Sequence, residues 1–164
     1  MRKRFVIVML LLLLTSGLIG CSSGQTADLP ALTVGGTMEV NPGAHSWNVK
    51  QGLGMWMAQE TGTVFPLDYL DAYPAFPLPA DGVIPLDWAV APDSYRVAYW
   101  TEDVWDDGMD ATMTDGQIND QGFLMPKEDT PAMVTVQAQW NKRIFRGWYG
   151  NVEYVFKKIG RAHV

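Results

Sequence analysis

Residues suited to covalent catalysis and to metal binding are scarce in this chain of 164 residues, which has one Cys and two His. A single Cys cannot form an intrachain disulfide, so the burial of apolar side chains must stabilise the fold. The histidines, His45 and His163, are too few for a three-histidine zinc site, and no Cys/His spacing resembles a metal-binding knuckle. We therefore expect no metal site of these kinds.

Catalytic motifs are missing as well. The sequence contains neither the Gly-x-Ser-x-Gly turn of many serine hydrolases nor a glycine-rich phosphate-binding motif. A Ser–His–Asp arrangement would have to use His45, with Ser46 or Ser94 as the nucleophile. These absences predict a protein that is not an enzyme, and a hydrolase built on His45 stays only as a hypothesis to test.

Basic residues are few relative to acidic ones: 12 Lys and Arg stand against 18 Asp and Glu, giving a net charge of −6. An acidic balance argues against nucleic-acid binding and against broad adhesion to anionic lipid headgroups. The charges are also unevenly placed, because Lys50 and Arg96 are the only basic residues between Cys21 and Pro126. The folded domain is therefore expected to be electrically polarised.

Long apolar runs are limited to one, from Phe5 to Leu14. It is too short to cross a bilayer as a permanent helix, which needs about 20 residues. The basic head Arg2–Arg4 precedes the run and small residues follow it, which is typical of an export signal. We therefore expect residues 1–20 to be a signal peptide.

The leader ends in the tetrad Leu18-Ile19-Gly20-Cys21. This tetrad resembles the lipobox of bacterial lipoproteins. The resemblance implies cleavage between Gly20 and Cys21, and a covalent diacylglycerol or N-acyl lipid on the Cys21 sulfur or amine. Two acyl chains hold a protein firmly on a membrane, whereas one holds it only marginally. The predicted location is the outer face of the cell membrane, and the alternative is an ordinary secretory signal with a chance Cys.

The remaining chain divides into a tether and one domain. Residues 21–29 are expected to form the acylated Cys and a flexible tether, because Ser22–Asp28 is small and polar. Those seven residues span at most about 25 Å when fully extended. Residues 30–164 are expected to form a single β-domain close to the membrane.

Alternation of apolar and polar residues predicts seven or eight short strands and no amphipathic helix in the domain. Gly35-Gly36 predicts a two-residue hairpin turn between Ala31–Val34 and Thr37–Val40. Pro85 predicts an edge position or a bulge within Val83–Trp88. Met133–Trp140 and Asn151–Lys158 predict a hairpin near the sheet centre, and the whole pattern predicts a β-sandwich.

Three of these strands support a second resemblance. Their sequences are Tyr95-Arg96-Val97-Ala98-Tyr99-Trp100, Val134-Thr135-Val136-Gln137-Ala138-Gln139-Trp140 and Gly150-Asn151-Val152-Glu153-Tyr154-Val155-Phe156-Lys157. Together they resemble the immunoglobulin-like domain of an uncharacterised family of Gram-positive lipoproteins. The resemblance implies an immunoglobulin-like β-sandwich on the outer side of a membrane, and it implies no reaction.

The turn between the last two strands is the first candidate contact site. Its cations and its one aromatic ring are Lys142, Arg143, Phe145 and Arg146. An exposed ring among three cations suits anionic lipid headgroups or an acidic partner. The alternative, which we favour from sequence alone, is a solvated hairpin tip without a partner.

Two ligand sites are also considered. A glycan-stacking surface would use the aromatic residues of the proline-rich segment, Trp56, Tyr69, Tyr73 and Phe76, although we favour burial in the core for these rings. A calcium site would use the acidic side chains Asp103, Asp106, Asp107 and Asp110, followed by Asp115 and Asp120. Their spacing does not match an EF-hand, so we favour a solvated hairpin loop with Asp-Gly turns.

These observations predict a membrane-anchored extracytoplasmic lipoprotein that acts as a non-enzymatic binding or interaction module. Its partner would be a protein or another envelope component, since loops on β-sandwiches commonly carry recognition. The alternative is a lipoprotein that binds cell-wall glycan or calcium.

Overall fold

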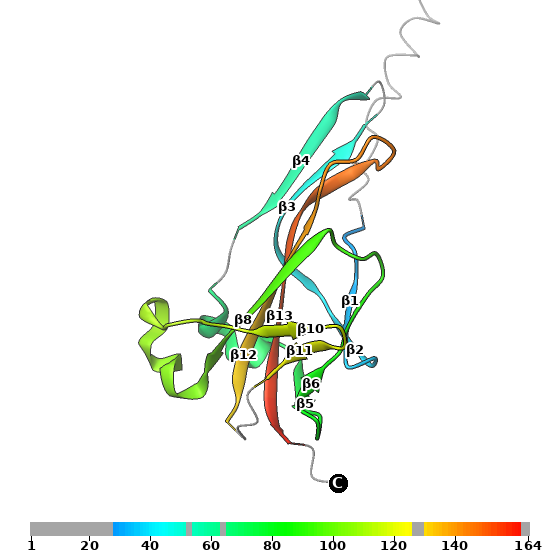
Figure 1. Ribbon diagram of the computed structural model, residues 1–164. Coiled ribbons are helices and arrows are strands. Elements are labelled where there is room, and N and C mark those ends of the chain that lie inside the picture. The colour runs from blue at the N-terminus through cyan, green and yellow to red at the C-terminus, as the bar shows by residue number, and fades with distance from the viewer. Residues whose placement is uncertain (1–27, 52–53, 63–64, 126–129, 162–164) are drawn as a thin grey trace, which may run out of the picture.

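The computed structural model describes residues 28–51, 54–62, 65–125 and 130–161 (Figure 1). The predicted signal peptide, Gly20, Cys21 and most of the tether lie outside these ranges. The described strands are β1 (Leu32–Val34), β2 (Met38–Val40), β3 (Pro42–Lys50), β4 (Trp56–Thr61), β5 (Ala75–Leu78), β6 (Val83–Ile84), β7 (Leu86–Trp88), β8 (Ser94–Thr101), β9 (Thr114–Asp115), β10 (Gln117–Asn119), β11 (Gly122–Leu124), β12 (Ala132–Trp140) and β13 (Trp148–Arg161). Two 3-10 helices, η2 (Pro66–Ala72) and η3 (Glu102–Asp110), accompany them.

The all-β class is confirmed, since the described residues form three sheets that are mainly antiparallel. The predicted number of seven or eight strands is wrong. One reason is Pro85, which divides the predicted strand 83–88 into β6 and β7 because proline cannot donate to a ladder. The other reason is that short segments such as β5 and β9 have no alternating pattern of their own, yet they pair with longer strands.

The central sheet has seven strands, in the order β4-β3-β13-β12-β8-β9, with β5 parallel to β13. β12 and β13 pair from Ala132↔Lys158 to Trp140↔Gly150, so the predicted hairpin near the sheet centre is confirmed. The long strand β13 also pairs with β3 near its start and with β5 near its end. The sheet is therefore organised around one 14-residue strand.

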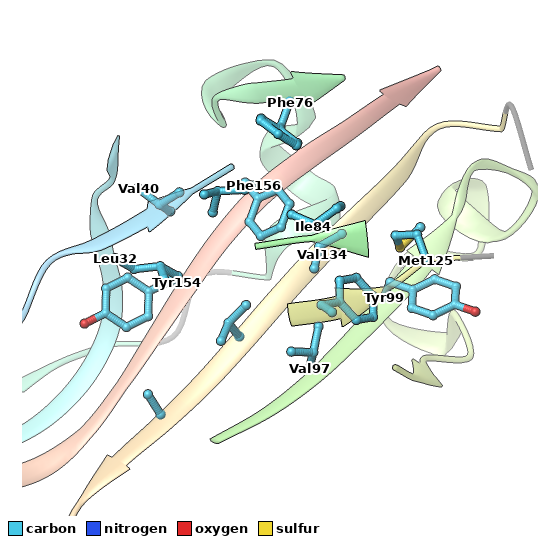
Figure 2. Packing of buried hydrophobic residues seen from close by; sticks show 14 of the residues in the cluster. Leu32, Val40, Phe76, Ile84, Val97, Tyr99, Met125, Val134, Tyr154 and Phe156 are labelled. Carbon is cyan, nitrogen blue, oxygen red and sulfur yellow. The ribbon is translucent and has the colours of Figure 1, made fainter. Parts of the chain in front are cut away.

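Alternation gives the central sheet an inner, apolar face. On β12, Val134, Val136 and Ala138 point inward, and on β13 the inward residues include Tyr154 and Phe156. Two three-stranded sheets, β2-β1-β7 and β10-β11-β6, supply the residues that meet them, among them Leu32, Val40, Ile84 and Phe123. Figure 2 shows side chains from both layers packed against each other. A large sheet covered by two smaller ones is the sandwich that the alternation predicted.

The first hairpin is one residue longer at its turn than predicted. Val34 pairs with Met38, so the loop contains Gly35, Gly36 and Thr37. Gly35 and Gly36 both have positive φ values, +60° and +71°. The Phe76 ring fills the space where a Cβ at Gly35 would lie, so only glycine fits there.

The outer face of the central sheet carries a second, smaller core at one end. Leu67 of η2, Trp100 of β8, Met133 of β12 and Val155 of β13 are buried together, and Trp105 of η3 packs against them. The Trp105 indole donates a hydrogen bond of 3.1 Å to the Trp100 carbonyl. The segment predicted as an acidic hairpin loop therefore begins as a 3-10 helix, because its few apolar residues cover the outer face.

The first described residues are fixed to the inner core by Tyr154. The Tyr154 hydroxyl donates a hydrogen bond to the Pro30 carbonyl, and the side chain is fully buried. Leu29, predicted as the end of the tether, already packs against this core. Leu29 is thus part of the packed domain.

Replacing Tyr154 with Phe should lower the free energy of unfolding by about 1 kcal/mol, because the Pro30 carbonyl loses its donor. Burial raises the pKa of Tyr154 well above its ordinary value of 10.0. The neutral phenol is therefore favoured in the fold, and its stabilising effect is complete below pH 10 and lost as the pH rises further. Urea unfolding of the Tyr154→Phe variant should show a shallower loss of stability above pH 10 than the parent. Equal slopes would contradict this role.

Candidate functional site

The end of the outer face that η2 and η3 leave uncovered carries polar side chains from four adjacent strands. We call this surface the polar face, and its members are Ser46, Ser94, Arg96, Gln137, Gln139, Asn151 and Glu153. All of them occupy outward positions of β3, β8, β12 and β13, in alternation with core residues. The same alternation that builds the inner core therefore builds this surface.

Register aligns the polar face in two rows across the sheet. In one row Asn151 pairs with both Ser46 and Gln139, and Gln139 pairs with Ser94. In the other row Gln137 stands between Glu153 and Arg96. The rows bring together residues from positions 46 to 153, which no local motif could reveal.

Hydrogen bonds hold the second row in place. Arg96 Nε donates to Gln137 Oε1 at 2.8 Å, and Gln137 Nε2 donates to Glu153 Oε1 at 3.3 Å. The Thr135 hydroxyl donates to the same Glu153 oxygen at 2.7 Å. The Glu153 carboxylate is therefore oriented by two donors within the sheet. Burial, and to a smaller extent this carboxylate, raises the pKa of the nearby Tyr73.

The polar face surrounds a shallow hollow of about 620 Å³. Ala44 and Ala138 are among the other residues that line it. Amides, a guanidinium and a carboxylate supply both donors and acceptors around it. Such a surface suits a ligand that is itself rich in hydrogen-bonding groups.

His45, Ser46 and Ser94 all line this hollow. In the His45 ring, Nδ1 lies 3.1 Å from Thr61 Oγ1 and 3.2 Å from the Gly43 carbonyl oxygen. Ser46 instead donates to Glu60 Oε1 at 3.3 Å. In the described part of the chain, His45 forms no hydrogen bond with Ser46 or Ser94. The hydrolase hypothesis therefore gains no geometric support.

The predicted contact turn lies between β12 and β13, and we call residues 141–147 the tip. Ile144 and Phe145 extend into solvent, with 90% and 100% of their side chains exposed. Phe145 was the predicted contact ring of this turn, and Ile144 beside it is exposed as well. The structure therefore gives the tip two exposed apolar side chains.

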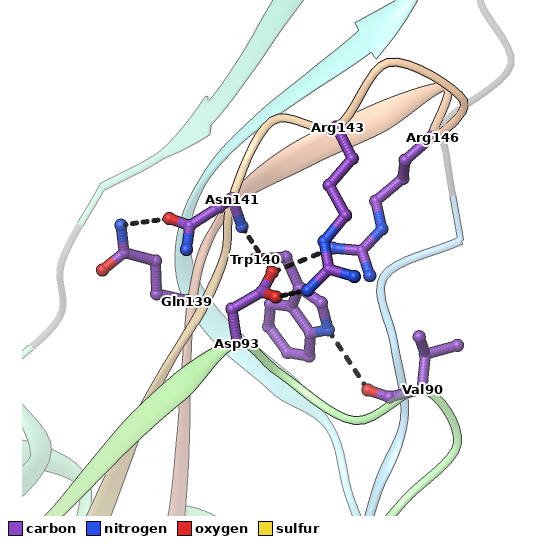
Figure 3. Close-up of polar contacts among 7 residues, drawn as sticks. All are labelled: Val90, Asp93, Gln139, Trp140, Asn141, Arg143 and Arg146. Atoms are coloured by element: carbon purple, nitrogen blue, oxygen red, sulfur yellow. Dashed lines mark hydrogen bonds and ion pairs between the residues drawn. The ribbon is translucent and has the colours of Figure 1, made fainter.

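The tip is braced by Asp93, which lies just before β8 (Figure 3). Both Arg143 and Arg146 form ion pairs with its carboxylate, and the Asn141 N–H donates to it at 2.8 Å. Behind them, the Trp140 indole donates to the Val90 carbonyl at 3.2 Å. These contacts fix the base of the tip while its end stays exposed.

A second hollow, of about 470 Å³, lies beside the tip. Its lining includes Lys50 from β3 together with Lys142 and Arg143, and the Trp56 side chain forms another wall. Lys142 Nζ lies 4.7 Å from the centre of the Trp56 ring and 5.6 Å from that of Tyr149. We call this surface the basic end; it gathers cations from residues that are far apart in sequence.

The four aromatic residues predicted as a glycan-stacking surface do not form one surface. Phe76 is buried in the inner core, whereas Tyr73 packs against the outer core. Tyr69 lies on η2 with 55% of its side chain exposed, and Trp56 contacts Tyr149 and Lys142 at the basic end. For Phe76 the core reading is the right one, because β5 turns its alternate residues inward.

The acidic residues predicted as calcium ligands are spread over several elements. Asp103, Asp106, Asp107 and Asp110 lie on η3, whereas Asp115 lies on β9 and Asp120 in the turn after β10. Gly108, with φ +57°, interrupts the helical geometry in the middle of η3. Among the residues that the structure describes, no three or more His, Cys, Asp or Glu side chains lie where they could jointly hold a metal ion.

Comparisons with protein-family models, with curated proteins and with solved structures gave no match for this chain. Within the described part of the chain, no helix combines the length and apolarity needed to cross a membrane.

Proposed function

We propose that the chain is a lipid-anchored extracytoplasmic protein whose domain is a non-enzymatic binding module, with the polar face as its recognition surface. One observation carries the proposal: η2 and η3 cover one end of the outer sheet face and leave the polar face open. Strand pairing fixes the spacing of these side chains, so a ligand would meet donors and acceptors that are already placed.

The proposed anchor is supported by the leader, by the tetrad ending at Cys21 and by the absence of any other thiol in the sequence. A lipid on Cys21 would hold the domain on the outer face of the cell membrane. The tether from Ser22 to Asp28 limits its distance from the bilayer to about 25 Å. The polar face would then recognise a protein or another component of the envelope.

We further propose that the sandwich is of the immunoglobulin-like type. The three sequences that carry this resemblance lie on β8, β12 and β13, which are neighbours in the central sheet. An experimentally determined structure whose strand connections differ from the immunoglobulin order would reject this assignment.

A second candidate function is the binding of cell-wall glycan at the same surface. Tyr149 lies two residues before Asn151 on β13, so an aromatic ring adjoins the amides of the polar face. Sugars are commonly held by such combinations of ring stacking and hydrogen bonding. Calcium binding stays as a further alternative, to be tested by a calcium-dependent shift in melting temperature.

A crosslinking experiment tests the proposed recognition surface. Acylation would block Cys21, so Asn151→Cys would supply one reactive thiol on the polar face for a photoactivatable crosslinker. Irradiation in intact envelopes should give a discrete adduct from this position. Glu39→Cys, which is exposed on β2 in a different sheet, serves as the matched control and should give none.

Arg96→Ala together with Gln137→Ala should weaken formation of that adduct. Removing two hydrogen-bonding side chains should cost about 1–3 kcal/mol of binding free energy, which is roughly a 5- to 150-fold loss of affinity. Competition by soluble wall fragments would identify a glycan ligand, whereas an adduct with a protein band would identify a protein partner. Equal labelling from positions 39 and 151 would contradict the proposal.

A further inference from the structure

The tip exposes apolar side chains in a way that a solvated hairpin does not require. Ile144 and Phe145 are adjacent and are the most exposed large apolar residues at this end of the described domain. Burying either of them against an apolar medium is favourable. The tip therefore offers a small apolar wedge.

Cations surround this wedge in a chain that is acidic overall. Lys50, Lys142 and Arg143 line the hollow of the basic end, and Arg146 lies beside them at the base of the tip. The Asp93 carboxylate forms ion pairs with Arg143 and Arg146 and offsets one of these positive charges. The local charge is thus positive although the net charge of the chain is −6. Such a surface is complementary to an anionic one.

Two cations at this end of the domain lie against aromatic rings. Lys142 is held over the Trp56 and Tyr149 rings, and Arg146 lies 4.7 Å from the centre of the Trp148 ring. The tryptophan and tyrosine rings are amphipathic groups that are enriched where membrane and water meet. An apolar wedge, flanking rings and cations around a hollow are the parts of a phospholipid-binding surface.

The path of the chain brings its amino-terminal end toward the same region. Leu32 pairs with Trp88, and the Ala89 N–H donates to the Ala31 carbonyl. Residues before Ala31 therefore continue alongside the segment after Ala89, which leads to Asp93 and the base of the tip. Figure 1 shows the first described residues on the same half of the molecule as the loop after β12. A tether of at most about 25 Å would thus pull the basic end toward the bilayer.

We infer that the basic end docks on an anionic phospholipid surface, with headgroup phosphates in the hollow lined by Lys50, Lys142 and Arg143 and with Ile144 and Phe145 in the interfacial region of the bilayer. The inference rests on the proposed membrane location, but it does not require a particular lipid on Cys21. Docking in this way would set the orientation of the polar face relative to the membrane. The acidic remainder of the domain would stay away from the anionic surface, which fits the predicted lack of broad adhesion.

Hydrogen exchange of the purified full chain tests this docking. With vesicles that contain phosphatidylglycerol, the amides of residues 142–147 should exchange at least about tenfold more slowly than with phosphatidylcholine vesicles, because the wedge is buried and the cations are paired. The amides of β9 and β10 should exchange equally with both lipids and serve as the internal control. Inorganic phosphate without vesicles should give no protection.

Substitutions locate the effect. Ile144→Ser with Phe145→Ser should abolish the protection, and Lys142→Glu should reduce it about fivefold or more. The two apolar residues are exposed, so their replacement leaves the core intact. Ile118→Ser, at an exposed apolar position on β10, is the matched control and should leave the protection unchanged.

Equal exchange with the two lipids, or protection that survives the double substitution, would overturn the inference. Protection by inorganic phosphate alone would indicate an ion site and would also overturn it. An acidic protein as the true occupant would leave the tip unprotected by either lipid. Intact-mass measurement of the same sample reports the state of Cys21, so a failure of the proposed anchor is seen separately from a failure of the docking.

Discussion

Replacing Gly150 with Ala is expected to lower the free energy of unfolding by about 2–6 kcal/mol. Gly150 has φ +155°, a conformation that residues with a Cβ rarely adopt, and this strain costs about 1–3 kcal/mol. A Cβ at this position would also lie 2.2 Å from the Ser46 carbonyl oxygen and 2.8 Å from the Trp47 ring. Relieving that overlap requires movement of β3 against β13 and costs about 1–3 kcal/mol more.

Gly147→Ala is the matched control, since it adds the same methyl group three residues earlier. No atom lies within 4 Å of a Cβ built at Gly147. Its effect on the free energy of unfolding should therefore stay within about 0.5 kcal/mol. Urea unfolding followed by tryptophan fluorescence measures both variants. Similar stabilities for the two would contradict the close packing of β3 on β13 at this point.

The position of Gly150 illustrates which parts of the fold the sequence could predict. Alternation along Met133–Trp140 and Asn151–Lys158 is a local signal, and it identified both central strands and their inward residues correctly. It could not identify β3 as the other neighbour of β13, because that pairing joins residues about a hundred positions apart. The close approach that requires glycine at position 150 follows from this distant pairing.

Errors in the predicted fold arose where the local signal was weak. The segment that contains Phe76 has prolines and no clear alternation, so its strand β5 was missed. The acidic segment after Glu102 suggested a loop, whereas Val104 and Trp105 supply enough apolar surface to hold it against the outer core. In both cases tertiary contacts decide a conformation that the local residues leave open.

The candidate sites differ in the same way. The tip lies between two strongly predicted strands, so its position at a hairpin end followed from sequence. The place of Lys50 in the basic end could not be predicted from sequence, because β3 reaches the tip only through its pairing with β13. The polar face was likewise missed: each of its residues is an ordinary outward position, and only the register of four strands brings them together.

Cys21→Ser is expected to end firm membrane attachment of the chain. If two acyl chains are carried by this residue, their loss should lower membrane partitioning by about 10⁴-fold or more. A leader that stayed on the chain would not replace them, since its apolar run from Phe5 to Leu14 is too short to span a bilayer. Alkaline extraction of membranes should therefore release the variant and retain the parent protein. Intact-mass measurement should find acyl chains on the parent alone.

A second variant separates the thiol from its position. Cys21→Ser combined with Ser22→Cys keeps the composition of the chain and moves the thiol one residue beyond the tetrad, so it should be released like Cys21→Ser. The tip should remain functional in both variants, since it lies far from residue 21 in sequence and needs no acyl group. Their residual binding should therefore be weak, require anionic lipid and vanish at high salt, where the tip cations are screened. A parent protein without acyl mass, or release that is equal for parent and variants, would contradict the anchor at Cys21.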